Sequence, residues 1–265
     1  MNKPELHFAH ANGLPSDCYG KLFRALSDDV DVKNLPVIGM DPLYPVRRHW
    51  HALADQVADS IRVRCHGPVI GVGHSLGGLC TFIAAHRHPE LFRGLVIMDP
   101  PVINGPGALA FSAMRWLGQV DRITPAGKSR HRREVWPSRQ VARELLRPKG
   151  LFRTFDEECF EDYLRFGLTD CPEGVCLTIP ASVEVEIFRA TPTDAWRYRR
   201  PLAVPGVLLT GSRSEFKGSG FAERMARTAG MLHREVDGGH MFPLEHPLET
   251  AAAIRQALHD TGLLP

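Results

Sequence analysis

Gly73-His74-Ser75-Leu76-Gly77-Gly78 joins an apolar run, Pro68 to Val72, to a helical pattern that starts at Leu79. The order of strand, sharp turn and helix is typical of a nucleophile elbow, a strained turn that lifts a nucleophilic side chain above the edge of a sheet. Glycine is expected at positions 73 and 77, because a side chain there would collide with the neighbouring helix or strand. Since Gly-x-Ser-x-Gly alone also arises by chance, the rest of the chain must support this interpretation.

Short apolar runs alternate with helical patterns along much of the 265-residue chain. This alternation predicts an α/β fold with a mostly parallel sheet of about six strands and helices on both faces. Strands are expected at residues 6–10, 30–37, 69–73, 94–98, 207–210 and 232–236. Helices are expected at residues 17–26, 50–64, 79–88, 221–229 and 248–258.

The alternation stops between residues 103 and 200, where the sequence becomes helical, rich in arginine and interrupted by prolines. An insertion of this size between two strands favours a helical lid over one edge of the sheet rather than a separate domain. We therefore expect a core domain made of residues 1–102 and 201–265, and a helical lid, or cap, made of residues 103–200.

Composition excludes several classes of protein. The formal net charge of +2 does not call for a nucleic-acid partner. Apolar stretches are too short to cross a bilayer, and the start, Met1 to Glu5, lacks the features of a secretory leader. We therefore expect a cytoplasmic protein without a membrane span, and the sequence leaves a monomer and a homodimer equally open.

The six cysteines are scattered along the chain. Cys18, Cys65 and Cys80 fall at core-like or helical positions, so buried thiols in a reducing compartment are expected rather than bridges. Cys171 and Cys176 lack the spacing of a zinc knuckle, and no His-x-x-x-His pair completes a metal site. Neither a metal nor a cofactor is expected.

Acyl transfer needs backbone N–H groups aimed at the oxyanion that develops during the reaction, usually one after the nucleophile and one from a loop after a neighbouring strand. Leu76 is the candidate for the first N–H. A glycine-bearing loop follows the first strand, and there Asn12 or Leu14 is the candidate for the second. The alternative is an ordinary strand-to-helix turn.

A serine nucleophile also needs a base within hydrogen-bond reach. Among the thirteen histidines, His240 is favoured because it follows Gly238-Gly239 directly after the last expected strand. His246 lies at a helix start and is expected at the surface. The glycine-bearing loop that contains Asn12 and Leu14 is called the oxyanion loop below, and His10 is expected to pack beneath it. His74 is expected to point the wrong way along the turn to act as the base.

The acid that orients the histidine has two candidates. Asp99 ends a buried-strand pattern directly after the helix that follows Ser75. Glu215 follows the next strand, one residue after Ser214, which stands where an aspartate would usually be found. We favour Asp99, because only Asp99 ends a strand in register. The alternative is that Asp99 has no catalytic role and is only a capping residue before Pro100.

The chain resembles the α/β-hydrolase superfamily of serine hydrolases. The resemblance is carried, in chain order, by the loop after the first strand, the Ser75 turn, Asp99 and Gly238-Gly239-His240. The resemblance spans nearly the whole chain outside the insertion. It implies an eight-stranded parent sheet without its first two strands, and a triad of Ser75, His240 and an acid. It also implies a carboxylesterase- or thioesterase-like hydrolase that acts on a small-molecule acyl substrate.

Two other interpretations stay open. Gly71, Gly73 and Gly77 also form a variant of the glycine pattern of dinucleotide-binding turns, which would make the protein a nucleotide-dependent oxidoreductase. Against this, no Tyr-x-x-x-Lys pair is present, and His240 would have no role. The other alternative is a catalytically inactive, hydrolase-like binding protein.

Substrate contacts are expected from His74, Met241, Phe242 and Trp116. The segment from Arg122 to Arg153 is strongly basic, with only Glu134 and Glu144 as acids. It could attract an anionic acyl substrate or a carrier such as a coenzyme A thioester. Alternatively, its arginines pair with the acidic stretch at residues 156–162.

Overall fold

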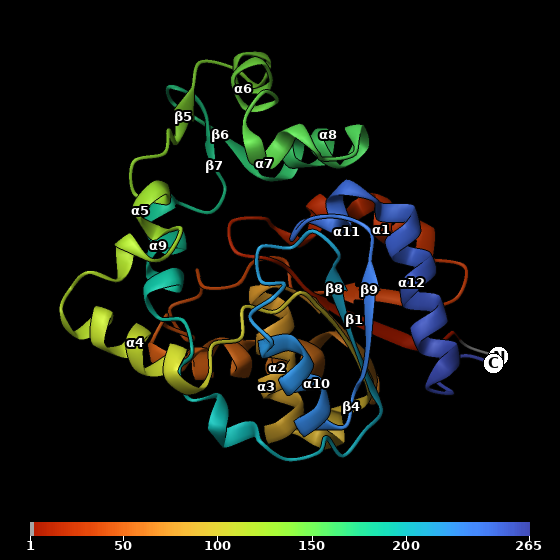
Figure 1. The fold of residues 1–265 in the computed structure, drawn as a ribbon. Helices are drawn as coiled ribbons and strands as arrows, with labels where there is room; N and C mark the ends of the chain where they lie inside the picture. Colours follow the sequence, from red (N-terminus) through yellow and green to blue (C-terminus); the bar gives the residue numbers. More distant parts are fainter. Residues whose placement is uncertain (1–2) are drawn as a thin grey trace.

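A computed structural model describes residues 3–265, so residues 1 and 2 of the expected core segment 1–102 lie outside the described residues. At its centre is a six-stranded sheet in the order β2-β1-β3-β4-β8-β9, with every neighbouring pair parallel (Figure 1). The strands are β1 (Glu5–Ala9), β2 (Asp31–Asn34), β3 (Val69–His74), β4 (Phe92–Met98), β8 (Gly206–Gly211) and β9 (Leu232–Val236). The predicted fold class is confirmed.

Both faces of the sheet are covered. In β4, Val96 and Met98 belong to one hydrophobic core, whereas Leu95 and Ile97 belong to the other. Successive side chains of a strand point to opposite faces, so a central strand must be apolar throughout. This is why the inner strands β3, β4 and β8 are apolar runs in the sequence, whereas the edge strands β2 and β9 carry charged residues.

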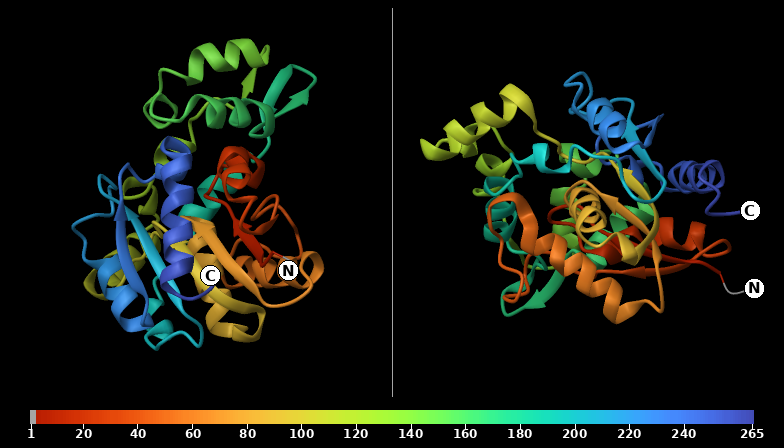
Figure 2. Two further views of the ribbon diagram at one scale, coloured as in Figure 1. Left: turned by 90° about the vertical axis from the view of Figure 1, so that its right-hand side faces the viewer. Right: turned by 90° about the horizontal axis from the view of Figure 1, so that it is seen from below.

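The helices divide between the two cores. Helices α1 and α12 contribute to the core that contains Val96, and α2, α3 and α10 contribute to the core that contains Leu95. Figure 2 shows α12 running along the sheet. The longer helices of the core domain are α1 (Gly20–Leu26), α2 (His51–Arg64), α3 (Leu76–Arg87), α10 (Phe221–Ala229) and α12 (Pro247–Asp260). The short ones are η1 (Ser16–Tyr19), η2 (Arg48–Trp50), η3 (Pro89–Leu91) and α11 (Phe242–Glu245).

The insertion between β4 and β8 is not purely helical, and the expectation of a helical segment is wrong in this respect. It contains a three-stranded sheet in the order β5-β7-β6, with both pairs antiparallel. Its strands are β5 (Val135–Trp136), β6 (Leu168–Cys171) and β7 (Gly174–Leu177). Its helices are α4 (Gly105–Trp116), η4 (Val120–Arg122), α5 (Ala126–Ser129), α6 (Arg139–Leu146), α7 (Gly150–Arg153), α8 (Glu157–Phe166), α9 (Ala181–Arg189) and η5 (Ala195–Tyr198).

Part of the insertion stands as a separate layer above the core domain (Figures 1 and 2). Within this layer, the ring centroid of Phe152 lies 4.5 Å from that of Tyr163 and 5.7 Å from that of Phe160. Lys21 of α1 ties it to the core domain through an ion pair of 2.9 Å with Asp156. The aromatic side chains of the insertion therefore continue the hydrophobic core that contains Phe8 and Tyr19 of the core domain.

Cys18 and Cys80 are buried as expected, whereas Cys65 is partly exposed. Across residues 3–265, the helices are all too short or too polar to span a membrane.

Candidate active site

Ser75 lies at the tip of a strained turn between β3 and α3. Its backbone has φ 52° and ψ −116°, a conformation that a non-glycine residue adopts only when the surroundings impose it. The turn is held by a 2.8 Å hydrogen bond from the Ser75 N–H to the Met98 carbonyl. A Cβ at Gly73 would lie 2.6 Å from the Gly77 carbonyl oxygen, and a Cβ at Gly77 would overlap the Ala9 carbonyl. The steric requirement for glycine at both positions is confirmed.

Three side chains from distant parts of the chain meet at the carboxyl ends of the parallel strands. The Nε2 atom of His240 lies 3.0 Å from the Ser75 Oγ, and its Nδ1 lies 2.6 Å from Oδ2 of Asp99. Asp99 is 2% exposed and Ser75 is 8% exposed. This is the serine, imidazole and carboxylate arrangement in which the ring can accept the hydroxyl proton while the carboxylate fixes its tautomer.

The carboxylate of Asp99 is held from several sides. Oδ1 accepts a 3.2 Å hydrogen bond from the Gly211 N–H, and Oδ2 accepts a 2.6 Å bond from the Ser214 hydroxyl. Asp99 itself has a φ of 42°, in the left-handed region. Of the two candidate acids, the structure brings Asp99 together with His240, whereas Glu215 is exposed.

Sequence reasoning missed Phe216. Its ring meets the His240 ring edge-on, with centroids 5.0 Å apart and an interplanar angle of 87°. The contact packs an apolar surface against the imidazole and restricts its rotation. A pattern of spacing could not identify it, because Phe216 lies in a loop without regular structure, directly after Glu215.

The loop after β1 lies against the Ser75 turn through a 3.0 Å hydrogen bond from the Gly77 N–H to the His10 carbonyl. Leu76 is the first residue of α3, so its N–H has no partner within the helix. The Leu14 N–H already donates to the Ala11 carbonyl at 3.2 Å, which removes Leu14 as a candidate oxyanion donor. Among the described residues the Asn12 N–H donates no hydrogen bond, so Asn12 is the remaining candidate for the second N–H.

The insertion touches this same loop. The Asn12 Nδ2 donates a 3.1 Å hydrogen bond to the Glu184 carbonyl of α9. Glu184 is buried, and its carboxylate pairs with Arg132, which also donates to the Tyr163 hydroxyl at 3.2 Å. Gly13 has a φ of 77°, and a Cβ there would overlap the Glu184 carboxylate. The conformation of the oxyanion loop therefore depends on residues of the insertion.

His74 does not lie where a substrate contact was expected. Its side chain is fully buried, and its Nε2 donates a 2.9 Å hydrogen bond to the His240 carbonyl. The Tyr19 hydroxyl donates to Nδ1 at 2.8 Å and in turn accepts from the Ala11 N–H at 3.3 Å. Burial lowers the pKa of His74 to about 3, so the ring is neutral, as these bonds require.

His10 packs beneath the oxyanion loop, as expected. Its Nδ1 donates to the Ala11 carbonyl at 2.7 Å, and its Nε2 accepts from the Ile38 N–H at 2.8 Å. Burial lowers the pKa of His10 to about 4. Two neutral histidines thus support the backbone on either side of the candidate site.

The other three expected substrate contacts lie in different surroundings. Met241 is 7% exposed and Phe242 is fully buried in the core, with its ring 6.3 Å from that of His74. Phe242 therefore supports the site from below. Trp116, at the end of α4, is 82% exposed and lies on the outer surface, so the structure does not bring it into an enclosed site.

Many arginines of the basic segment are engaged with acids. Arg143 pairs with Glu157 and Glu161, and Arg147 pairs with Glu157 at 2.9 Å. These contacts agree with the interpretation in which the arginines of this segment pair with the acidic stretch at residues 156–162. Within residues 3–265, no cluster of three or more His, Cys, Asp or Glu side chains is arranged to hold a metal ion.

A family model with the description "Alpha/beta hydrolase family" matches residues 8–253. The type I acyl-CoA thioesterase mpaH of Penicillium roqueforti is 31% identical over 180 residues, which cover 62% of this chain and 40% of that protein. The type I acyl-CoA thioesterase mpaH' of Penicillium brevicompactum is 24% identical over 197 residues, which cover 68% and 42%. The chain thus spans about two fifths of the length of these curated relatives.

Solved structures resemble the whole chain. E-2-(acetamidomethylene)succinate hydrolase aligns with a TM-score of 0.75 and 19% identity, over 98% of this chain and 92% of that one. The thioesterase domain from the curacin biosynthetic pathway aligns with a TM-score of 0.73 and 14% identity, over 96% and 91%. At these identities the likeness shows a shared fold.

Proposed function

The chain belongs to the alpha/beta hydrolase family, and we propose that it is a serine hydrolase that cleaves an ester or related acyl bond through an acyl-enzyme on Ser75. The observation that carries this proposal is the continuous line of contacts from Ser75 through His240 to Asp99, at 3.0 and 2.6 Å. Such a line activates a hydroxyl that is otherwise a weak nucleophile at neutral pH.

In the proposed reaction, His240 takes the Ser75 proton as the hydroxyl attacks the acyl carbon. The tetrahedral oxyanion accepts hydrogen bonds from the N–H groups of Leu76 and Asn12. His240 then returns the proton to the leaving group, and the acyl group stays on Ser75. Water, activated by the same imidazole, attacks the acyl-enzyme, and collapse of the second tetrahedral intermediate releases the acid and restores the Ser75 hydroxyl.

The insertion at residues 103–200 acts as a lid in this proposal. It supports the oxyanion loop through the Asn12 to Glu184 hydrogen bond and the buried pair of Glu184 with Arg132. A loop fixed in this way keeps its N–H donors preorganised before the substrate binds. The cytoplasmic location stays a prediction.

Acyl thioesters are the first substrates to test, because two relatives are named acyl-CoA thioesterases. p-Nitrophenyl esters and acyl thioesters of graded chain length separate the ester and thioester possibilities. Ser75→Ala should reduce turnover of every accepted substrate by several orders of magnitude while the protein remains folded. Ser27→Ala, at an exposed serine whose hydroxyl bonds only to the Arg24 carbonyl, is the matched control. Turnover by Ser75→Ala at the wild-type rate contradicts the proposal.

A further inference from the structure

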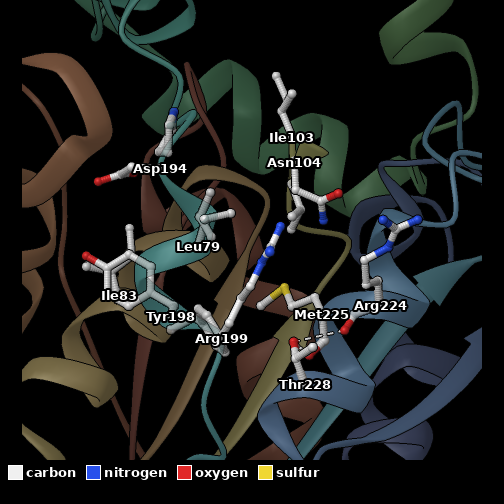
Figure 3. A pocket seen from close by; sticks show the side chains of 14 residues that line it. Leu79, Ile83, Ile103, Asn104, Asp194, Tyr198, Arg199, Arg224, Met225 and Thr228 are labelled. Atoms are coloured by element: carbon white, nitrogen blue, oxygen red, sulfur yellow. Dashed lines mark hydrogen bonds between the residues drawn. The ribbon is translucent and has the colours of Figure 1, made fainter. Parts of the chain in front are cut away.

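A cavity lies beside α3 and α10, between the two points where the chain leaves and re-enters the core domain (Figure 3). Its apolar part is formed by Leu79 and Ile83 of α3 and by Met225 of α10. Its polar part is formed by Asn104, Arg199 and Arg224. We call it the α3–α10 cavity.

The two arginines of this cavity differ from those of the basic segment. Arg199 and Arg224 are exposed, and within residues 3–265 neither guanidinium forms an ion pair or a hydrogen bond. In Figure 3, both side chains extend along the cavity toward the side where Asn104 lies. A guanidinium offers several N–H donors in a planar fork that fits carboxylate and phosphate oxygens. Two unengaged guanidinium groups at one cavity therefore favour an anionic ligand.

Asn104 adds an independent observation. It is only 7% exposed, and its Oδ1 is buried without a hydrogen-bond partner among the described residues. Although it occupies the N-cap position of α4, its side chain makes no capping hydrogen bond. Buried polar atoms without partners are uncommon in folded proteins, because the lost hydration is not replaced. The Oδ1 of Asn104 is therefore an unsatisfied acceptor in the lining of the cavity, which a small side-chain rotation would offer to a ligand N–H or O–H group.

The carboxylate of Asp194 also lines the cavity, and its negative charge is compensated only in part. His49 and His51 contact it at 3.1 Å each, and Arg197 contacts it at 3.4 Å. His51 and Arg197 engage Oδ2, whereas Oδ1 is buried without a hydrogen-bond partner among the described residues. An anionic group in the cavity must therefore lie toward Arg199 and Arg224 and away from Asp194.

The cavity adjoins the proposed catalytic serine. Leu79 lies one helical turn after Ser75 on α3, about 6 Å along the helix axis. Val102, three residues after Asp99, lines both this cavity and a second cavity that contains Asp99. The near end of the α3–α10 cavity therefore lies about one helical turn from Ser75.

We propose that the α3–α10 cavity binds the far end of the substrate, an apolar chain that carries a carboxylate or phosphate group. The chain lies on Leu79, Ile83 and Met225. The anionic group accepts hydrogen bonds from Arg199 and Arg224, and an amide or hydroxyl group of the ligand donates to Asn104. This inference rests on the proposed function and adds to it the chemical class of the substrate.

Two pairs of substrates test the proposal and identify where the anion sits. p-Nitrophenyl octanoate is compared with the mono-p-nitrophenyl ester of octanedioic acid, which has a carboxylate at the far end of the acyl chain. Octanoyl-coenzyme A is compared with octanoyl-N-acetylcysteamine, which lacks the phosphates of the leaving group. We expect Arg199→Glu and Arg224→Glu each to lower the ratio of kcat/KM for the anionic over the neutral member at least tenfold in one pair. The affected pair shows whether the anion belongs to the acyl part or to the leaving group.

Arg227→Glu is the matched control, because Arg227 is an exposed arginine of the same helix outside the cavity lining. It should leave both ratios within twofold of wild type. Equal ratios in wild type, Arg199→Glu and Arg224→Glu overturn the proposal. Should no ester or thioester be hydrolysed at all, calorimetric binding of octanedioate and coenzyme A to the same proteins tests the cavity separately. In that case, at least tenfold weaker binding in both Glu variants supports the cavity, and equal or absent binding rejects it.

Asn104→Leu separates a ligand-binding role from a structural one. Leucine has nearly the shape of asparagine but no unpartnered acceptor, so the free protein should keep or gain thermal stability. Loss of the acceptor should raise KM for the preferred anionic substrate at least threefold. A variant that loses stability and keeps its KM assigns Asn104 to the fold and contradicts its place in the proposal.

Discussion

The hydroxyl of Ser214 donates a 2.6 Å hydrogen bond to Oδ2 of Asp99, the same oxygen that faces the His240 ring. The two residues follow neighbouring strands, β8 and β4, and both are buried. A serine thus stands where an acid would usually be found and supports the acid of the adjacent strand. This relationship explains how His240 meets a carboxylate although the customary position holds none.

Replacing the two candidate acids compares them directly. Asp99→Asn should lower kcat by a factor on the order of 10³ to 10⁴, because an amide no longer holds the imidazole in the tautomer that accepts the Ser75 proton. Glu215→Gln should leave kcat within twofold, because Glu215 is exposed. The measurement is steady-state ester hydrolysis by the two purified variants. A loss confined to Glu215→Gln contradicts the assignment of Asp99.

Ser214→Ala tests the support of the acid. The buried Asp99 carboxylate loses a charge-assisted hydrogen bond, so the free energy of unfolding should fall by about 1.5–3 kcal/mol. Because Asp99 also becomes less firmly placed, kcat should fall several-fold. Ser212→Ala in the same loop is the control, since its hydroxyl bonds to exposed Asp237 and its loss should change stability by under about 1 kcal/mol. Urea unfolding of the wild type and the two variants measures these differences. If Ser214→Ala and Ser212→Ala unfold at indistinguishable midpoints, Ser214 does not stabilise the Asp99 carboxylate.

Tyr19→Phe removes the hydroxyl that joins the oxyanion loop to the Ser75 turn. The Ala11 N–H and the Nδ1 atom of His74 both lose their buried partner, which should cost about 1–3 kcal/mol of unfolding free energy. We also expect a lower kcat, because Ala11 directly precedes the proposed donor Asn12. Tyr44→Phe, which removes a hydrogen bond to partly exposed Asp59, should leave kcat unchanged. If both variants keep wild-type kcat, the hydroxyl of Tyr19 does not position the loop.

Four buried histidines predict how stability depends on pH. Burial lowers the pKa of His7 and His74 to about 3 and that of His10 and His86 to about 4, from an ordinary 6.5. The unfolded chain therefore binds more protons than the folded one below pH 6.5, and stability falls as the pH is lowered toward 4. Each fully shifted histidine contributes up to about 1.4 kcal/mol per pH unit in this window. Urea unfolding at pH 7.5, 6.5, 5.5 and 4.5 measures the slope, and a constant unfolding free energy from pH 7 to 5 rules this explanation out.

How much the sequence predicts depends on the distance between the residues involved. The Ser75 turn and the Gly238-Gly239 loop before His240 are local patterns, so glycine spacing and strand ends suffice to find them. The mostly parallel sheet with helices on both faces follows from the alternation of apolar runs and helical patterns. The catalytic roles of these residues stay predictions until the variants above are measured.

Features that depend on long-range contacts could not be predicted in this way. His74 meets Tyr19 across 55 positions of sequence, and this pairing turns an expected substrate contact into a buried hydrogen-bonded support. Asn12 is favoured over Leu14 as the second oxyanion donor only because the Leu14 N–H already donates to the Ala11 carbonyl. The small sheet of the insertion escaped because β5 has only two residues and pairs with a strand far along the chain.

The most direct test of the central claim, that Ser75 is an activated nucleophile, is labelling with a serine-reactive fluorophosphonate followed by mass spectrometry. We predict that wild-type protein gains one adduct, located on Ser75, that Ser75→Ala gains none, and that His240→Ala reacts at least a hundredfold more slowly. An unlabelled wild-type protein, or an adduct that persists in Ser75→Ala, would contradict the claim.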